Sequence, residues 1–445
     1  MTDIEQWFRD NAITEVECLV PDMTGIPRGK IMPARKYISG GKPRLPETIF
    51  VQTVTGDYPD DCYDHINPSE VDMLLVADTS SVRLVPWANE PTAQLIHDCV
   101  YVDGDPVSIA PRHVLRRILD TYEQRGWQAV VAPELEFYLV NRNTDPDYPL
   151  EAPVGRSGRR ETGRRSYSID AVNEFDPLFE EMYEFCEAQN LTIETLVHED
   201  GAAQVEINFL HGDPLKLADE VFLFKRTMRE VALRHGIYAT FMAKPIASEP
   251  GSSMHVHQSV VDRETGRNMF VGDDGKPNKQ CLSYMGGLQK YLPLAMPLLA
   301  PNVNSYRRLR PDMAAPINTE WGYDNRTVGL RVPIDEPDAT RIENRLAGAD
   351  ANPYLAIAAT LACGYLGMME RLDPTPPLYG SGYDRPHSLP TDLSQALQPF
   401  TECRELRDLL GDRFVDTFAA LKRSEYVAYF RIISSWEREH LLMSV

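Results

Sequence analysis

The sequence predicts an α+β protein with a small N-terminal domain and a larger C-terminal domain. Three observations support this fold class. The first hundred residues have the pattern of strands and turns, residues 111–125 have helical spacing, and strand-like segments then alternate with further helical segments. Runs of strands with flanking helices are typical of α+β folds. We place the domain boundary after Asp103, which gives domains of residues 1–103 and 104–445.

Strands are expected at four places in the N-terminal domain. Residues 15–20 alternate, and a turn at residues 22–25 precedes a second strand near residues 29–32. Residues 73–77 and 82–85 flank a short polar turn. That spacing predicts that the last two strands form a hairpin.

Helices and long loops are expected in the C-terminal domain. The helix over residues 111–125 places one apolar face on Val114, Leu115, Ile118, Leu119 and Tyr122. Further helices are expected near residues 171–188, 214–236, 282–298 and 352–371. Residues 141–168 and 373–392 are rich in Pro and Gly and predict loops, and the first contains five arginines between Arg156 and Arg165.

The composition excludes several classes of protein. A net charge of −21 disfavours a nucleic-acid binder. Of the basic residues, 35 are Arg and 10 are Lys, a balance that favours bidentate binding of phosphate or carboxylate. The seven cysteines form no CxxC pair, the N-terminus is polar, and the longest apolar run, residues 354–369, is short for a bilayer. We therefore expect a soluble cytoplasmic protein with no membrane partner.

Four strand-like segments carry polar groups on one face. Glu134 and Glu136 alternate with apolar residues, as do Gln204, Glu206 and Asn208, then Ser253, His255, His257 and Ser259, and finally Arg341, Glu343 and Arg345. Each segment alone fits the solvent-facing side of a sheet. Together they predict a channel in which carboxylates hold hard divalent cations and arginines hold anions. The chain has no P-loop, dinucleotide fingerprint or nucleophile elbow, so this pattern indicates phosphoryl chemistry without a P-loop.

These motifs, in this order, resemble the glutamine synthetase family over nearly the whole chain. The resemblance depends on residues 133–137, 199–206, 251–257, 304–308, 325–331, 341–345 and 352–355. It implies an N-terminal β-grasp domain, then a catalytic domain with an antiparallel sheet and flanking helices. It also implies a homo-oligomer with active sites shared between subunits of a six-membered ring, or of two stacked rings.

The resemblance also implies roles for individual residues. Glu136, Glu199 and Glu206 would hold one metal ion, and Glu134, His255 and Glu343 a second, with two or three Mg²⁺ or Mn²⁺ in all. The implied positions for ATP are His257, Ser259, Arg331 and Arg341, and those for glutamate are Gly251, Arg308 and Arg345, with Arg326 on the transferring phosphoryl group. The implied reaction forms γ-glutamyl phosphate from glutamate and ATP, and an amine then displaces phosphate.

Two departures from the family pattern concern the amine. Members that use ammonium carry a Glu before Ala-Pro in a flap, where this chain has Ala314 within residues 311–316. The N-terminal loop that supplies an ammonium-binding Asp reads differently at residues 51–58, and Asp57 is the candidate catalytic replacement. Loss of one carboxylate opens volume for a bulkier amine with an apolar stem. We therefore expect a γ-glutamyl ligase for a polyamine or monoamine.

Several further features bear on the amine and on rival functions. Candidate pocket walls are Tyr58, Met313 and Trp321, and the acidic residues Asp60, Asp61 and Asp64 could guide a cationic polyamine. One alternative is a glutamine synthetase that uses ammonium, and another is a ligase for a different acid. A third is an inactive structural member of the fold, against which all six metal positions hold the expected residue types.

Overall fold

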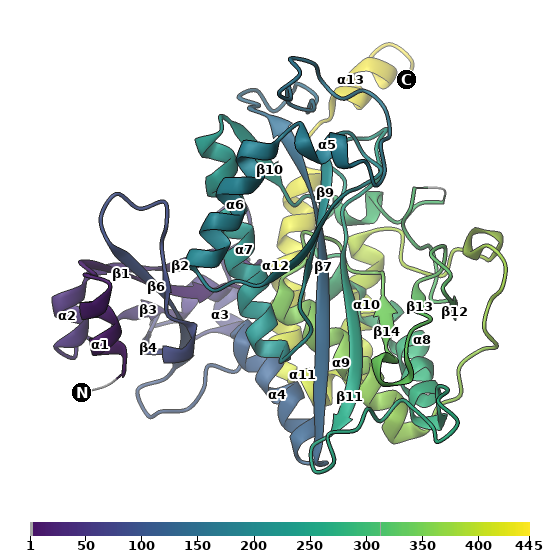
Figure 1. Cartoon of the computed structure of the whole chain (residues 1–445), viewed down its shortest axis with the longest axis horizontal. Helices are drawn as coiled ribbons and strands as arrows, with labels where there is room; N and C mark the ends of the chain where they lie inside the picture. The colour runs from purple at the N-terminus through teal and green to yellow at the C-terminus, as the bar shows by residue number, and fades with distance from the viewer. Residues whose placement is uncertain (1–2, 312) are drawn as a thin grey trace.

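Two sheets and the helices around them make up the protein (Figure 1). The computed structural model describes residues 3–311 and 313–445. The N-terminal sheet forms one lobe, and the larger sheet with most of the helices forms the other (Figure 1). This arrangement agrees with the predicted α+β class.

The N-terminal sheet joins strands from the first hundred residues. In the described part of the chain its order is β2-β1-β6-β4-β3, with β5 also paired to β6 and only β1 and β6 parallel. Its strands are β1 (Glu15–Pro21), β2 (Pro27–Pro33), β3 (Arg44–Pro46), β4 (Asp72–Ala77), β5 (Arg83–Leu84) and β6 (Thr92–Val100), with helices α1 (Asp3–Asp10), α2 (Ala34–Ile38) and α3 (Cys62–His65).

The predicted hairpin between residues 73–77 and 82–85 is wrong. Strands β4 and β5 do not pair with each other; Leu74 lies opposite Val100, and Leu84 lies opposite Ala93, so both strands run along β6. A 3₁₀ turn, Thr79–Ser81, separates them. Asp78 caps this turn by accepting the backbone N–H of Ser80, which favours a local turn over a tight hairpin.

The larger sheet contains the four polar-faced segments. In the described residues its order is β12-β13-β14-β11-β7-β9-β8, with β10 also paired to β7. Only β12 and β13 are parallel. The strands are β7 (Trp127–Asn141), β8 (Ile193–His198), β9 (Gln204–Phe209), β10 (Ile237–Thr240), β11 (Met254–Asp262), β12 (Trp321–Tyr323), β13 (Leu330–Val332) and β14 (Ile342–Asn344).

The helices of the larger lobe are α4 (Pro111–Glu123), α5 (Ile169–Asn173), α6 (Asp176–Ala188), α7 (Pro214–Arg234), α8 (Lys279–Leu299), α9 (Pro353–Glu370), α10 (Leu393–Glu402), α11 (Arg404–Leu410), α12 (Asp412–Phe430) and α13 (Ser435–Leu441). Helices α4 to α9 occupy the predicted segments, whereas α10 to α13 were not predicted. The one helix expected over residues 171–188 is divided into α5 and α6. Pro177 stands in the first turn of α6, where it starts a helix and cannot continue one.

Alternation on β7 separates the core from the site. Leu135, Phe137 and Leu139 are buried, and the Phe137 ring lies 6.1 Å from that of Phe224 on α7. On β11, the opposite face likewise meets helices, since the Gln258 amide donates to the Thr360 hydroxyl of α9 at 2.8 Å. Helices therefore cover one face of the sheet and leave the other for polar groups.

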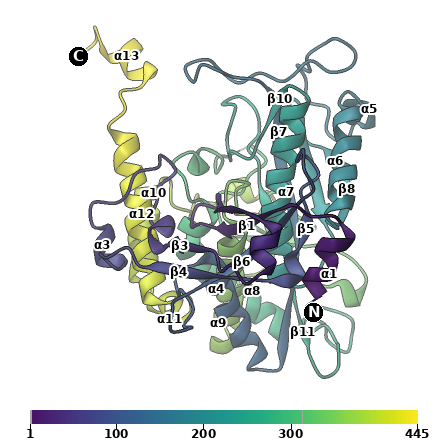
Figure 2. The same ribbon diagram turned by 90° about the vertical axis from the view of Figure 1, so that its left-hand side faces the viewer.

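Two helices differ sharply in how far they are buried. Helix α9 is buried along nearly its whole length, and no helix among the described residues is both long and apolar enough to span a bilayer. Helix α13 stands apart from the rest of the chain (Figure 2). Exposed apolar side chains cluster there and at the end of α12, including Phe430, Ile432, Ile433, Trp436 and Leu442.

Candidate active site

Strand register brings most of the predicted metal-binding groups into neighbouring rows on the polar face of the large sheet. Glu134 on β7 lies opposite His255 on β11, and Glu136 lies opposite Glu206 on β9. On the other side, His257 lies opposite Glu343 on β14. Cross-strand neighbours have Cβ atoms roughly 5 Å apart. Side chains from four strands can therefore converge on the same bound groups.

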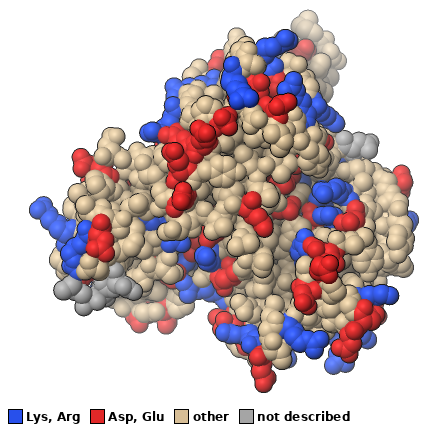
Figure 3. Space-filling model, viewed as in Figure 1, with Lys and Arg blue, Asp and Glu red and all other residues tan. Residues whose placement is uncertain are grey.

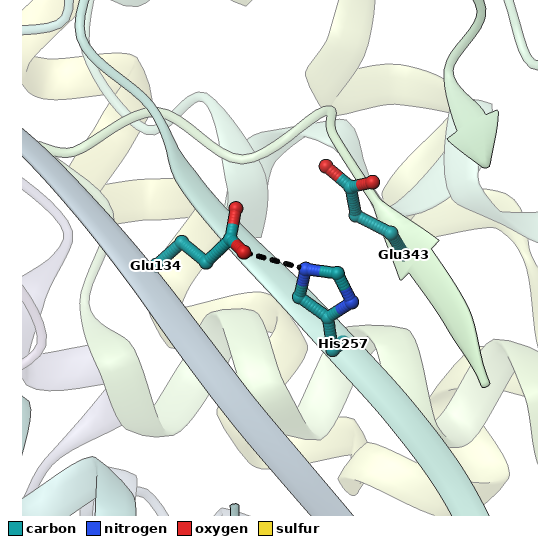
Figure 4. Close-up of side chains that lie close together, drawn as sticks. All are labelled: Glu134, His257 and Glu343. Atoms are coloured by element: carbon teal, nitrogen blue, oxygen red, sulfur yellow. Dashed lines mark hydrogen bonds and ion pairs between the residues drawn. The ribbon is translucent and has the colours of Figure 1, made fainter. Parts of the chain in front are cut away.

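Glu134 is the centre of this cluster. Its carboxylate accepts a hydrogen bond from His257 Nε2 at 2.8 Å and lies 3.4 Å from His255 Nδ1. Glu343 Oε1 lies 3.5 Å from the same His255 nitrogen. Figure 4 shows Glu134, His257 and Glu343 pointing toward one another from three strands. Two groups of ligand atoms are close enough to share an ion: Glu134 with His257 and Glu343, and Glu134 with Glu206 and His255.

His257 makes contacts that the sequence did not predict, in addition to its predicted role at ATP. Its Nε2 lies on Glu134, while its Nδ1 accepts from Arg341 Nε at 3.2 Å. These contacts fit the neutral ring protonated on Nε2. The alternate spacing of His255 and His257 predicted that both rings lie on one face of the strand. It could not predict which ring approaches the carboxylates.

Glu136, Glu199 and Glu206 occupy the other end of the site. The Glu136 carboxylate is buried and accepts the backbone N–H of Ser253 at 2.8 Å. Glu206 is its cross-strand neighbour, and Glu199 follows the end of β8. Gln204, on the same face of β9, donates to the Gly251 carbonyl at 3.0 Å and so links this end to the predicted glutamate site.

The electrostatics of these carboxylates differ along the site. Burial, then the charges of Glu134, Glu136, Glu199 and Glu343, hold the pKa of Glu206 well above its ordinary value. Burial, then the charge of Glu136, raises the pKa of Glu199 to about 8. Burial also acts to raise the pKa of Glu134, but hydrogen bonds from His255 and His257 outweigh it and lower that pKa. Repulsion is therefore concentrated around Glu206 and Glu199.

Arginines border the cluster at Glu343. Arg331 Nη1 lies 2.8 Å from Glu343 Oε2, and Arg345 Nη1 lies 2.5 Å from Glu343 Oε1. Burial acts to raise the pKa of Glu343, but Arg345 and the histidines hold it at about 2. Among the described residues, neither Arg331 Nε nor Arg345 Nε has a hydrogen-bond partner, although both atoms are buried. These donors are free for an anion.

Gly251 lies directly against the side chain of Arg308. A Cβ built on Gly251 would stand 2.3 Å from Arg308 Cγ and 2.5 Å from the Ala243 carbonyl oxygen, so a larger residue cannot fit. The Arg308 guanidinium is buried, donates to the Leu346 carbonyl, and has its pKa lowered by burial to about 10. The structure thus brings together two of the residues predicted to bind glutamate.

A cavity of about 340 Å³ opens beside the carboxylates. Its lining includes Glu134, His257, Ser259 and Arg341. The last three of these are among the four positions predicted for ATP. Asp335 pairs with Arg341 at 2.8 Å at this edge. The cavity is thus next to the cluster and has basic and acidic groups at its rim. Figure 3 shows the two signs of charge interspersed over this side of the molecule, rather than one continuous basic patch.

Other predicted residues lie outside the rows. Asp57 is on an exposed loop of the N-terminal lobe, where its carboxylate accepts the Thr55 hydroxyl at 2.9 Å, and no described contact joins it to the rows. Tyr58 is exposed on the same loop. Arg326 is exposed on the turn between β12 and β13, from which its charge opposes the rise in the pKa of Glu199. Trp321 is buried and donates to the Thr375 carbonyl at 2.6 Å, so it forms part of the packing.

The flap segment lies on the same lobe as the predicted glutamate site. Ala314 is exposed and has a left-handed backbone with φ of 57°. The Met313 sulfur lies 3.9 Å from Lys244 Nζ. Asp312, in the middle of this segment, lies outside the described residues.

The donor set fits divalent cations. Four carboxylates and two imidazoles on one sheet face, with Glu199 in the adjoining turn, form an oxygen-rich set, which suits Mg²⁺ or Mn²⁺ better than zinc. Burial and neighbouring carboxylates raise the pKa of Glu199 and Glu206, and the nearby arginines do not offset the rise at Glu199. A bound cation would supply a compensating positive charge.

Carboxylates and arginines thus lie beside a cavity on one face of a mixed sheet, an arrangement suited to an enzyme that holds divalent cations next to anionic substrates. Residues 108–441 match the family described as glutamine synthetase, catalytic domain. The chain therefore belongs to the glutamine synthetase family, and it is a ligase.

Relatives with different substrates share this similarity. The chain is 36% identical over 439 residues to gamma-glutamylputrescine synthetase PuuA of Escherichia coli K12, covering 96% of this chain and 91% of that one. It is 32% identical to glutamate–isopropylamine ligase of a Pseudomonas species, covering 98% and 96%. It is also 32% identical to glutamine synthetase of Pyrococcus abyssi, covering 96% and 92%. The solved structure titled "Apo GmaS without ligand" superposes with a TM-score of 0.84 at 28% identity, over 100% of both chains.

Proposed function

We propose that this protein joins the γ-carboxylate of glutamate to an organic amine, a polyamine or a monoamine, with ATP as cosubstrate. The observation that carries the proposal is the convergence of Glu134, Glu136, Glu206, His255 and Glu343 on one sheet face beside a cavity. The similarity to two ligases whose names specify organic amines supports the choice of amine.

The metal-binding roles follow the two ends of the site. Glu136, Glu199 and Glu206 would hold one cation, and Glu134, His255 and Glu343 a second, with His257 close enough to the second group to contribute. Two or three Mg²⁺ or Mn²⁺ would neutralise the charge on the phosphate oxygens.

The remaining residues position the two anionic substrates. Arg308, Arg345 and Gly251 would hold glutamate, and the unpartnered Nε atoms of Arg331 and Arg345 are donors for its carboxylate or for phosphate. His257, Ser259 and Arg341 would line the ATP site in the cavity, and Arg326 would contact the transferring phosphoryl group. Such donors stabilise charge that spreads over equatorial oxygens during transfer.

The proposed reaction has two balanced steps. A γ-carboxylate oxygen of glutamate attacks the γ-phosphorus of ATP, and ADP leaves, giving γ-glutamyl phosphate. The nitrogen of the neutral amine then attacks the acyl carbon, phosphate leaves, and the nitrogen gives up one proton. The product is a γ-glutamyl amide.

The flap supports an organic amine over ammonium. Ala314 brings no charge to the segment where ammonium-using members carry a Glu, and Met313 beside it offers an apolar side chain. Asp57 would approach the amine from a neighbouring subunit, because its own loop lies away from the rows. The second candidate is a glutamine synthetase that uses ammonium, which the similarity to the Pyrococcus abyssi enzyme favours.

The assembly and cellular setting complete the proposal. We propose a β-grasp domain at residues 1–103, a catalytic domain at residues 104–445, and a cytoplasmic homo-oligomer built as a hexameric ring or two stacked rings. Exposed apolar side chains such as Ile432, Ile433 and Trp436 support self-association. Light scattering on the purified protein should give a mass of six or twelve subunits, and a monomer would contradict the assembly.

A phosphate-release assay tests the function. Glutamate, ATP and Mg²⁺ or Mn²⁺ are combined with ammonium, putrescine, spermidine, ethanolamine or phenethylamine. We expect at least one organic amine to give a higher kcat/KM than ammonium. Turnover of ammonium as well as or better than every amine would favour the glutamine synthetase alternative.

A variant of the flap refines this test. Ala314→Glu should shift the preference toward ammonium, because it returns a carboxylate to the flap. An unchanged ratio of ammonium to amine turnover would remove the argument from Ala314. Val154→Glu, an exposed substitution on another loop, serves as a control for an added charge.

A further inference from the structure

The turn between β8 and β9 carries Glu199 and is held tightly from within. The backbone N–H of Glu199 donates to the Gln204 carbonyl at 2.9 Å, and that of Gly201 donates to Gln204 Oε1 at 2.9 Å. Ala203 has a left-handed backbone with φ of 57°. A non-glycine residue persists in this conformation only where the surroundings hold it.

A carboxylate from the arginine-rich loop holds this turn from outside. Glu161 Oε2 accepts the backbone N–H of Ala203 at 2.8 Å and lies 3.0 Å from His198 Nε2. The side chains of Glu161 and His198 are 8% and 1% exposed, so both contacts are shielded from water. The other His198 nitrogen, Nδ1, lies 2.7 Å from the Glu199 carbonyl oxygen. One buried carboxylate therefore contacts the residue before Glu199 and the strained residue that ends the turn.

The same loop contacts the turn at two more points. The backbone N–H of Tyr167 donates to the His198 carbonyl at 2.9 Å, and the Ser166 hydroxyl donates to the Asp200 carboxylate. Ser166 and Tyr167 are exposed, whereas the side chain of Glu161 is not. Glu161 is therefore the contact of this loop that water cannot replace.

We propose that Glu161 is a positioning residue that fixes Glu199 for the metal held by Glu136, Glu199 and Glu206. The inference rests on the proposed function, because it takes that metal group from it. Groups that orient a ligand from behind usually change metal affinity 10–100-fold when they are removed. Glu161 lies on a different segment from every proposed ligand, and of those ligands only Glu199 lies on the turn that Glu161 contacts. The arginine-rich loop therefore controls the metal group that contains Glu199 and leaves the other group unaffected.

Mn²⁺ binding to the full chain tests this role without relying on turnover. Titration with Mn²⁺, followed by electron paramagnetic resonance of the free ion and by calorimetry, resolves sites by affinity. Glu161→Ala should weaken one class of site by about 10–100-fold and leave the second class unchanged. Glu161→Gln should restore most of the affinity, because its amide oxygen can still accept the Ala203 N–H. Glu151→Gln, an exposed carboxylate of the same loop, should match the wild type.

The outcomes separate the inference from the function on which it rests. Wild-type Mn²⁺ affinity in Glu161→Ala, with a loss in Glu199→Gln, overturns the role of Glu161 while the metal group stands. Wild-type affinity in Glu199→Gln as well overturns the metal assignment itself. If Glu161→Ala does not fold, Glu161→Asp draws the carboxylate back by one methylene and should weaken the same class several-fold. Wild-type affinity in folded Glu161→Asp would then refute the inference.

Discussion

Glu206→Gln should stabilise the metal-free protein and remove much of its response to divalent cations. The substitution keeps the shape of the side chain and removes one of several mutually repelling carboxylates. Burial and the charges of Glu134, Glu136, Glu199 and Glu343 already hold the pKa of Glu206 well above its ordinary value. At this position the native state is therefore destabilised, either by repulsion between carboxylates or by the uptake of a proton.

The register sets the magnitude. Glu206 lies opposite Glu136, which places their Cβ atoms roughly 5 Å apart, and two charges at a similar separation repel by about 3 kcal/mol at an effective dielectric constant of about 20. Proton uptake by Glu206 limits this cost, so we expect a gain of about 1–3 kcal/mol at pH 7.5. For a protein of this size the melting temperature should rise by roughly 1–3 °C.

The assay compares thermal melts in EDTA and in Mg²⁺. A cation whose free concentration is a hundred times its Kd stabilises the native wild type by about 2.7 kcal/mol. Loss of one metal-binding side chain should reduce that gain. The control is Glu184→Gln, an exposed carboxylate on α6, which should melt like the wild type in both buffers. A lower melting temperature for Glu206→Gln in EDTA, or a wild-type response to Mg²⁺, would refute the reasoning.

Three further predictions address other parts of the molecule. Gly251→Ala should raise the KM for glutamate at least tenfold and leave that for ATP unchanged, because its Cβ would stand 2.3 Å from Arg308 Cγ; an unchanged glutamate KM contradicts this. Glu136→Ala should abolish phosphate release with every amine, and full activity would disprove its metal role. His97 is buried, and burial lowers its pKa to about 4, so only the unfolded chain takes up its proton below pH 6.5. The free energy of unfolding therefore falls as pH drops from 6.5 toward 4. Chemical denaturation at pH 6.5 and pH 5 should show that this free energy falls by about 2 kcal/mol more in the wild type than in His97→Gln. Equal losses in the two proteins would exclude His97 as the cause.

Much of the site could be predicted because strand alternation is a local property. Glu134 and Glu136 face one side of β7 and Phe137 the other, as period-two spacing requires. The partner of a strand is not local. Residues 73–77 and 82–85 have the pattern of a hairpin, yet both strands pair with β6, whose sequence lies further along the chain.

The same limit applies to individual side chains in the site. Spacing placed His255 and His257 on one face, and the register puts His255 opposite Glu134, yet the His257 ring makes the shorter contact with Glu134, at 2.8 Å. Trp321 is an aromatic residue near the flap in the sequence, and its hydrogen bond to Thr375 shows that it belongs to the packing. Glu161 lies in a loop full of charges, where nothing in the sequence distinguishes a buried carboxylate from a solvated one.

The division between sheet and flap has a consequence for how such an enzyme can acquire new substrates. The carboxylates and histidines stand on strands whose reverse faces pack on helices, so a change there disturbs the core as well as the chemistry. Ala314 is exposed on an irregular segment, so a substitution there costs little packing, whereas its neighbour Ala315 is buried. Libraries confined to Met313 and Ala314 should therefore yield folded proteins with altered amine preference far more often than libraries on β7 or β11. Selection in nature would meet the same asymmetry, which lets one phosphoryl-transfer scaffold serve many nitrogen nucleophiles.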